Sequence, residues 1–386
     1  MKDIAREVEE LAPRLVAWRR DFHRHPELAF QERRTSGIVR DFLEVCGIQV
    51  TSCGGTGVRG VLEGSRQGPT IALRADMDAL PVAEENDTDY RSEQAGVMHA
   101  CGHDGHMAIL MGAAKVLAGR RGALAGNVVF LFQPAEEDPP GGAQRMIADG
   151  ALDGVDRVFG LHLWQPLPSG IVGITAGPMM AQSDKFTVTV QGRGGHASQP
   201  DRAVDPVLVA SHLVVAAQSI ASRFVDPLAP VVVTFTTIHG GLVHNIIPDE
   251  VVLGGTVRCF DLDLQRAVKA RLQEVCERTC ALFGASALFQ YEDGYPPVVN
   301  HADMVDLVTR VAQQQLGDDS VFRMAPVMGG EDFARYLQQV PGAFAMLGAG
   351  DDRPFPHHNA RFDIDERVLP LGVRLMVGVA LEIVGA

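Results

Sequence analysis

The chain has 386 residues, of which 46% are hydrophobic, and this length predicts two domains. Asp and Glu outnumber Lys and Arg by 48 to 34, which gives a formal net charge of −14. Because nucleic acids and anionic membranes attract basic surfaces, and no Lys/Arg-rich run occurs, the charge argues against both as partners.

The two ends of the chain predict helices of different kinds. Residues 1–20 place apolar side chains at helical spacing without a continuous apolar core, which indicates an amphipathic surface helix and not a signal peptide. Residues 368–386 are almost long enough to span a bilayer, but Arg374 and Glu382 interrupt the stretch. We therefore expect a core helix there, and no membrane partner.

The first half of the chain alternates between predicted strands and helices. Short apolar runs at 71–75 and 127–132 predict buried strands, and 107–117 has helical spacing between them. This alternation predicts an α/β layer.

The segment 185–298 has a different order of predicted elements. Alternating or apolar runs predict strands at 185–191, 231–238, 250–260 and 286–291, and helices at 205–224 and 262–283. The resulting βαββαβ order is typical of a ferredoxin-like domain. If 183–297 forms such a domain, it is inserted into a discontinuous larger domain built from 1–182 and 298–386.

Residues 99–106, His-Ala-Cys-Gly-His-Asp-Gly-His, combine nitrogen, sulfur and oxygen donors in a way that indicates a metal site. Cys101 and His103 flank a glycine, and a tight turn there can aim both side chains at one ion. For His99, Asp104 and His106 we expect hydrogen-bonding support of the turn.

Two adjacent carboxylates, Glu136 and Glu137, follow the predicted strand at 127–132. Adjacent glutamates usually lie on a solvated surface, but beside a metal cluster one can hold the ion while the other takes a proton from water. This combination predicts metal-assisted hydrolysis.

Other candidates are less specific. Asp76 and Asp78 follow a strand end, where paired carboxylates often orient ligands. Residues 55–60 match the Gly-x-Gly-x-x-Gly dinucleotide motif, but the residues after them predict a strand or turn and not the helix that would bind phosphate. Spacing alone leaves three histidines undecided between core, surface and ligand roles: His162, His357 and His358.

Taken together, these motifs resemble the metal-dependent amidohydrolases that include hippurate hydrolase, N-acyl-amino-acid amidohydrolases and indoleacetyl-amino-acid hydrolases. The resemblance covers nearly the whole chain, through segments 22–28, 74–81, 98–106, 133–137, 160–163, 194–197, 245–249, 330–333 and 358–363. It implies a zinc-peptidase-like catalytic domain with an inserted lid or dimerisation domain, and a homodimer or dimer-based tetramer.

The resemblance also implies roles for individual residues. It implies two divalent metal ions per subunit, zinc or manganese with cobalt or nickel as alternatives, held by Cys101, His103, Glu137, His162 and His358. Further roles are implied for Glu136 as general acid/base, Asp78 as support for a ligand, His196 at the active site of a partner subunit, and Asn245 and Arg258 at the substrate carboxylate. Arg258 has an alternative interpretation as a strand residue paired with a surface acid, and the match at 361–363 favours His358 over His357.

We therefore expect hydrolysis of the amide bond of N-acyl amino acids, hippurate-like or indoleacetyl-amino-acid-like, in the cytoplasm. The six cysteines lack the pattern of a small secreted scaffold and indicate free thiols, which supports that location. The alternatives are a dipeptidase or carboxypeptidase, and a non-catalytic protein that binds metal and an acyl-amino acid. Glu136 discriminates the enzymes from the binding protein, since a binding protein needs no carboxylate beside the one that holds the metal.

Overall fold

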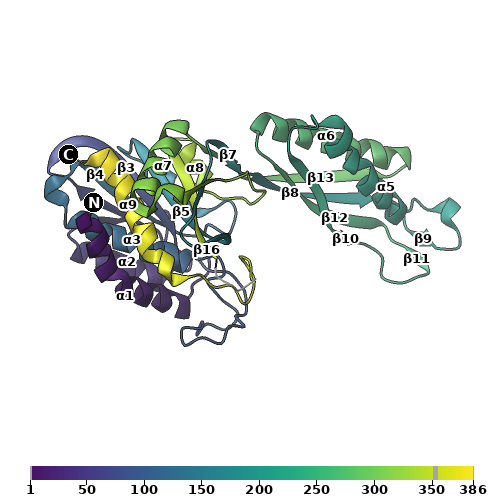
Figure 1. Ribbon diagram of the computed structural model, residues 1–386. Coiled ribbons are helices and arrows are strands. Elements are labelled where there is room, and N and C mark those ends of the chain that lie inside the picture. The colour runs from purple at the N-terminus through teal and green to yellow at the C-terminus, as the bar shows by residue number, and fades with distance from the viewer. Residues whose placement is uncertain (1, 351–354, 386) are drawn as a thin grey trace. The chain divides into compact units, whose positions relative to one another are not determined.

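The computed structural model describes residues 2–350 and 355–385, and the chain divides into two compact units (Figure 1). The larger unit comprises Met1–Met179, Val299–Ala325 and Asp332–Ala386, and the smaller unit comprises Met180–Val298 and Pro326–Glu331. We describe each unit by itself.

The larger unit is built on an eight-stranded sheet in the order β1-β2-β4-β3-β5-β16-β6-β15. Its four central strands, β4, β3, β5 and β16, are mutually parallel, whereas β1, β2 and β4 pair antiparallel. The strands are β1 Gln49–Ser52, β2 Val58–Glu63, β3 Arg66–Asp76, β4 Ala125–Gln133, β5 Arg157–Pro168, β6 Val172–Ile174, β15 Val321–Arg323 and β16 Gly342–Gly350.

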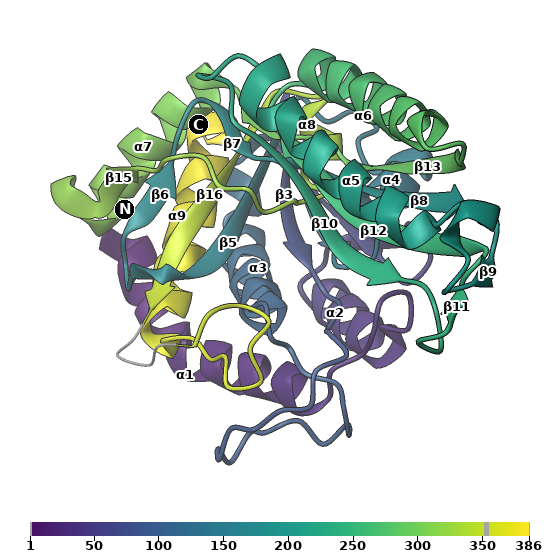
Figure 2. The same cartoon turned by 90° about the vertical axis from the view of Figure 1, so that its right-hand side faces the viewer.

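Helices pack on this sheet and bury its apolar side chains. α3 is buried on nearly all sides because it contacts β3 as well as α1 and α9, and Figure 2 shows the three helices with the sheet. α9 is largely buried, as expected for a core helix. The helices are α1 Lys2–Arg24, α2 Arg33–Val45, α3 His103–Ala118, α4 Gly142–Ala148, α7 Ala302–Leu316, α8 Ala334–Leu337 and α9 Leu369–Val384.

The smaller unit contains a four-stranded antiparallel sheet in the order β10-β12-β8-β13, with α5 and α6 packed on it. In chain order these elements are strand, helix, two strands, helix and strand, the βαββαβ arrangement of a ferredoxin-like fold. They are β8 Gln182–Gln191, α5 Pro206–Ser219, β10 Val231–His239, β12 Glu250–Cys259, α6 Leu262–Leu282 and β13 Ser286–Tyr295. The α/β fold class is thus confirmed.

The segment Pro206–Phe224, which contains α5, is long and apolar enough to cross a membrane by length and composition alone. One face of it, including Val209, Leu213 and Ala217, packs in the core of the smaller unit.

Two short strand pairs complete the topology. β9 Gly195–His196 pairs with β11 Ile246–Ile247 in the smaller unit, and β7 Gly177–Met180 pairs with β14 Val298–Asn300 where the chain passes from one unit to the other. The sequence did not predict that Pro326–Glu331 returns to the smaller unit, because a six-residue segment carries no periodicity of its own.

Candidate metal and catalytic site

The candidate site lies where the parallel strands of the larger unit end. Asp76 is the last residue of β3, Gln133 is the last residue of β4, and His162 lies on β5. In α/β sheets, ligands bind at the carboxyl ends of the parallel strands. The residues that follow these strand ends are therefore placed to converge.

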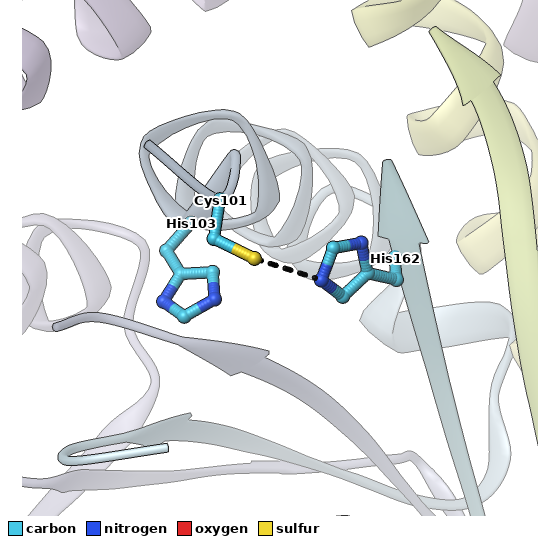
Figure 3. A group of neighbouring side chains, drawn as sticks. All are labelled: Cys101, His103 and His162. Carbon is cyan, nitrogen blue, oxygen red and sulfur yellow. Dashed lines mark hydrogen bonds between the residues drawn. The ribbon is translucent and has the colours of Figure 1, made fainter. Parts of the chain in front are cut away.

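Cys101, His103 and His162 form the centre of the site (Figure 3). Gly102 precedes α3 with φ +92°, a conformation that side chains disfavour, and this turn aims Cys101 and His103 into one buried space. The Cys101 Sγ lies 3.5 Å from His162 Nε2. One candidate ligand atom from each of the three residues lies within 4.8 Å of the others.

Both histidines present the same ring nitrogen. His103 Nδ1 lies 2.9 Å from the Asp78 carbonyl oxygen, and His162 Nδ1 lies 2.8 Å from the Leu163 carbonyl oxygen. Since a carbonyl only accepts, each Nδ1 carries a proton, so that in the neutral form of each ring the lone pair lies on Nε2. This is the arrangement that a ligating imidazole needs.

Glu136, Glu137 and His358 extend the cluster. His103, Glu136 and Glu137 form one group of donor atoms within 4.8 Å of one another, and Cys101, Glu137 and His358 form another. His358 Nε2 lies 3.1 Å from Glu137 Oε1. The turn before the glutamates passes through Ala135 at φ +51°, a left-handed conformation that costs a non-glycine residue about 1–2 kcal/mol.

His357 occupies a different place. Its Nε2 donates to the Leu163 carbonyl at 3.0 Å, and its ring stacks on Trp164 at 4.7 Å between centroids. Burial lowers the pKa of His357 to about 4, which keeps the ring neutral. Of the two neighbouring histidines, His358 is the one whose Nε2 lies beside Glu137.

Asp78 and His106 support the cluster by hydrogen bonds. The Asp78 Oδ2 accepts from the Glu137 amide at 2.9 Å. His106 Nδ1 donates to Asp76 at 2.6 Å, and its Nε2 accepts from the Leu163 amide at 2.8 Å. His106 therefore fixes the peptide next to His162, and not the turn at 99–106 that it was expected to support.

The other two residues of the 99–106 motif differ from each other. Asp104 accepts from the Gly105 amide within the motif at 2.9 Å, which is the predicted supporting role, and it also accepts from Arg19 at 2.8 Å and pairs with His23 at 2.7 Å. The prediction is wrong for His99, whose two ring nitrogens are buried without a hydrogen-bond partner among the described residues. Burial lowers the pKa of His99 to about 4, so the ring remains neutral.

The electrostatics of the cluster fit a cation. Burial, followed by the carboxylates of Glu137 and Glu136, holds the pKa of the Cys101 thiol well above its usual range. Burial lowers the pKa of His103, but Asp76 and Asp78 outweigh it and raise the pKa to about 10. Carboxylates that favour protons in this way also favour a metal ion.

A buried nitrogen of His103 also indicates a metal site. His103 Nε2 is buried and has no hydrogen-bond partner among residues 2–350 and 355–385. An orphaned imidazole nitrogen beside a thiol and carboxylates is the donor set of a zinc-type site. The residues present therefore fit bound metal.

A buried network that the sequence did not predict lies beside the site. Arg74 donates to Asp76 at 2.7 Å, to Gln133 at 2.9 Å and to Asp332 at 3.1 Å, and all four side chains are buried. Asp332 lies in the segment 330–333, one of those that resemble the family, but the segment alone indicates no role for it because its partners come from β3 and β4.

The three remaining candidates belong to the smaller unit. His196 lies on β9, and its Nδ1 accepts from the Ser198 amide at 3.1 Å, which leaves the proton of a neutral ring on Nε2. The main-chain carbonyl of Asn245 accepts a hydrogen bond from the Ala197 amide at 3.1 Å. Arg258 on β12 donates to the Met328 carbonyl at 3.0 Å, so its hydrogen-bond partner is main chain and not a surface acid.

Comparison with known proteins identifies the family. Residues 72–382 match the model of "Peptidase family M20/M25/M40". The chain belongs to this peptidase family. It is 41% identical over 384 residues to the YhaA protein of Bacillus subtilis (strain 168), with 98% of this chain and 97% of that protein covered.

The names of two other relatives state an activity. Thermostable carboxypeptidase 1 of Saccharolobus solfataricus is 39% identical, with 96% of this chain and 95% of that protein covered. The N-acyl-L-amino acid amidohydrolase of Geobacillus stearothermophilus is 44% identical over 301 residues, with 78% and 81% covered.

A solved structure from the M20 family is similar to this chain over nearly its whole length. The crystal structure of Bacillus subtilis YXEP, described as a dinuclear metal binding peptidase, aligns with a TM-score of 0.86 and 34% identity, covering 97% of this chain and 98% of that chain. The M20 family is dinuclear metal-binding, and this chain is a metal-dependent amidohydrolase.

Proposed function

We propose that this chain hydrolyses the amide bond of N-acyl amino acids to a carboxylic acid and a free amino acid. The observation that carries the proposal is the presence of two adjacent glutamates, Glu136 and Glu137, both with an oxygen within 4.8 Å of a ligand nitrogen of His103. A protein that only binds metal needs one of them. The second is what a hydrolase requires.

The roles divide between the two glutamates and their neighbours. We assign two divalent cations to five ligands: Cys101, His103, Glu137, His162 and His358. Bound cations would polarise the amide carbonyl and acidify water from a pKa of about 15.7 toward about 7. The thiolate and imidazole donors favour zinc, with manganese, cobalt or nickel as alternatives.

Glu136 is proposed as the general acid/base. Its carboxylate takes a proton from the attacking water and returns it to the leaving nitrogen, which departs as a neutral amine. Proton transfer by a positioned side chain contributes typically about 10²- to 10⁴-fold to the rate. Asp78 supports this arrangement, since it contacts both His103 and the Glu137 amide.

Two isosteric variants test the assignment. Glu136→Gln keeps the shape but cannot accept a proton, so we expect kcat on hippurate to fall at least 100-fold with metal content unchanged. Glu137→Gln is the matched control and should lose metal. A Glu136→Gln enzyme with near-normal kcat across the pH range would show that another group is the base.

The substrate carries a free α-carboxylate in this proposal. Arg258 and Asn245 are the candidates to bind it, because a guanidinium donates paired hydrogen bonds to a carboxylate. Hippurate should therefore be hydrolysed at least 100-fold more efficiently, in kcat/KM, than its amide. Equal efficiency would contradict the assignment of Arg258.

Carboxypeptidase activity is the second candidate, because a relative that covers 96% of this chain is named a carboxypeptidase. The chemistry is the same and the difference lies in the acyl group that the pocket accepts. A panel of N-acyl amino acids, N-blocked peptides and dipeptides, each assayed with zinc, manganese, cobalt or nickel, distinguishes the two activities.

We also propose a dimer in which His196 completes the site of the partner subunit. Large apolar side chains that are exposed concentrate in the smaller unit and include Val207, Leu208 and Val215 on α5 and Ile246 beside His196. An apolar surface of this kind typically marks an interface. The proton on Nε2 suits His196 to donate to a developing oxyanion.

Subunit complementation tests this role. We expect His196→Ala and Glu136→Gln chains, each nearly inactive, to regain activity when mixed, because one site of the heterodimer combines both intact residues. No recovery in demonstrated heterodimers would contradict a role across the interface. Loss of His196 should lower kcat more than it raises KM.

We further propose that the protein works in the cytoplasm. All six cysteines are free thiols, and five of them are buried, which suits a reducing compartment. Cell fractionation with an antibody against the chain measures the location directly.

A further inference from the structure

Glu32 is a buried carboxylate far from the metal cluster in sequence, and it contacts the turn that presents Glu136. It directly precedes α2, and its side chain is fully buried. Its Oε1 accepts from the Ala135 amide at 2.9 Å, and its Oε2 accepts from the Thr56 hydroxyl at 2.5 Å. Each of the two carboxylate oxygens thus accepts a hydrogen bond.

The residue that Glu32 binds is held at both of its peptide groups. Ala135 has φ +51°, and an alanine keeps such a conformation only where its surroundings enforce it. Besides the amide bond to Glu32, the Ala135 carbonyl accepts from the Gly142 amide at 3.0 Å. The backbone that leads into Glu136 is therefore fixed by contacts from two other segments.

The glycine-rich loop at 55–60 has a structural role in this arrangement. A Cβ on Gly57 would lie 2.3 Å from the Cys53 carbonyl oxygen and 3.2 Å from the Phe132 carbonyl oxygen, so only glycine allows the loop this close to the end of β4. That approach brings the Thr56 hydroxyl to Glu32. The motif that resembled a dinucleotide site thus orients a carboxylate.

Glu137 has an anchor of its own. Its amide donates to Asp78 Oδ2 at 2.9 Å, and its side chain lies beside His358. Loss of Glu32 should therefore displace Glu136 more than the neighbouring glutamate.

We propose that Glu32 is a positioning residue for the hydrolysis: through the Ala135 amide it holds the backbone before Glu136 and keeps that carboxylate in place for proton transfer. The proposal rests on the proposed role of Glu136. It adds a requirement that the cluster itself does not contain, namely an acceptor oxygen at position 32.

Kinetics of matched variants test the proposal. Glu32→Ala removes the acceptor, whereas Glu32→Gln retains an oxygen for the Ala135 amide, and Thr56 can rotate its hydroxyl to accept from the new amide group. We expect kcat to fall about 10- to 100-fold in Glu32→Ala, as for other residues that orient a site, and to stay within about fivefold in Glu32→Gln. Glu44→Ala, an exposed position on α2, is the control.

Two further measurements separate positioning from general loss of structure. KM and the zinc affinity of the apoprotein should stay within about threefold in Glu32→Ala, because the ligands keep their own contacts. A kcat within threefold of wild type in Glu32→Ala, or a Glu32→Gln enzyme as slow as Glu32→Ala, would overturn the proposal. If Glu32→Ala does not fold, Glu32→Met, which fills the buried space but also lacks the acceptor oxygen, takes its place, and an unchanged kcat there would overturn the proposal equally.

Hydrogen exchange tests the contact without relying on activity. The Ala135 amide should exchange faster in Glu32→Ala than in wild type, and at the wild-type rate in Glu32→Gln, whereas the Glu137 amide, which donates to Asp78, should be unaffected. Unchanged exchange in Glu32→Ala would overturn the positioning role. If the wild-type protein hydrolyses no N-acyl amino acid, the proposed function fails, while the exchange experiment still decides whether Glu32 holds the turn.

Discussion

Replacing Arg19 by methionine should destabilise the larger unit by about 3–5 kcal/mol. The Arg19 side chain is fully buried on α1 and donates to Asp104 at 2.8 Å and to Asp363 at 2.7 Å, both of which are also buried. Methionine fills the space of the aliphatic stem but removes the guanidinium that both buried carboxylates share. Removing one partner of a buried ion pair costs about 3–5 kcal/mol.

Urea unfolding followed by tryptophan fluorescence measures this effect. Both tryptophans of the chain, Trp18 and Trp164, lie in the larger unit and report on it. Arg6→Met is the control on the same helix, because Arg6 pairs with Glu10 on the exposed surface, where such a pair contributes about 0.5 kcal/mol or less. A difference below about 1 kcal/mol between Arg19→Met and Arg6→Met would refute the reasoning.

Three further outcomes are expected. Burial lowers the pKa of His23, but hydrogen bonds to Asp104 and Glu84 outweigh it, so that the pKa is raised overall. Protonated His23 therefore stabilises the folded state below about pH 6.5. In urea unfolding, the wild-type protein should be more stable than His23→Gln there, and this difference should shrink as the pH rises above that value. An advantage constant from pH 6 to 9 would contradict this. Gly142→Ala should lower kcat about tenfold or more, since a Cβ there would lie 1.8 Å from a backbone carbonyl oxygen, whereas Gly122→Ala, which meets open space, should be neutral in the same assay. Chelation should abolish hydrolysis and lower the melting temperature, with recovery on adding zinc or manganese, because a ligand at 1,000 times its Kd stabilises the folded state by about 4 kcal/mol; an unchanged melting temperature would argue against a bound metal.

Elements with strong periodicity were predictable from the sequence. The expected strand at 127–132 lies within β4 and the expected helix at 107–117 lies within α3, because an apolar run bounded by polar residues specifies burial directly. The strand β16, Gly342–Gly350, was not predicted. Alanine and glycine are poor strand formers by composition, but this central strand needs small residues: a Cβ on Gly342 or Gly348 would lie within 2.3 Å of a backbone oxygen.

The candidate site was predictable only where donors cluster in sequence. Cys101 and His103 share one turn, so their spacing indicates a common target. His162 and His358 could not be assigned from spacing, since His162 is a lone histidine in an apolar run, His358 stands beside a second histidine, and the contacts of both come from other elements. The fold brings His162 to 3.5 Å from Cys101 and His358 to 3.1 Å from Glu137.

Residues that support a site are harder to identify from the sequence than the ligands and the base that they support. Glu32 acts on Ala135 across 103 positions, and it does so through a backbone amide, which every residue except proline has. An oxygen acceptor at position 32 meets that need, and nothing in the local sequence marks such a residue as different from a surface glutamate. A metal ligand must match the ion in charge, softness and geometry, so its residue type is informative. Variants of the two kinds of residue should therefore behave differently. A metal ligand or the general base tolerates no isosteric change of its donor atom. A residue that positions the backbone should tolerate any side chain that keeps the acceptor oxygen in place.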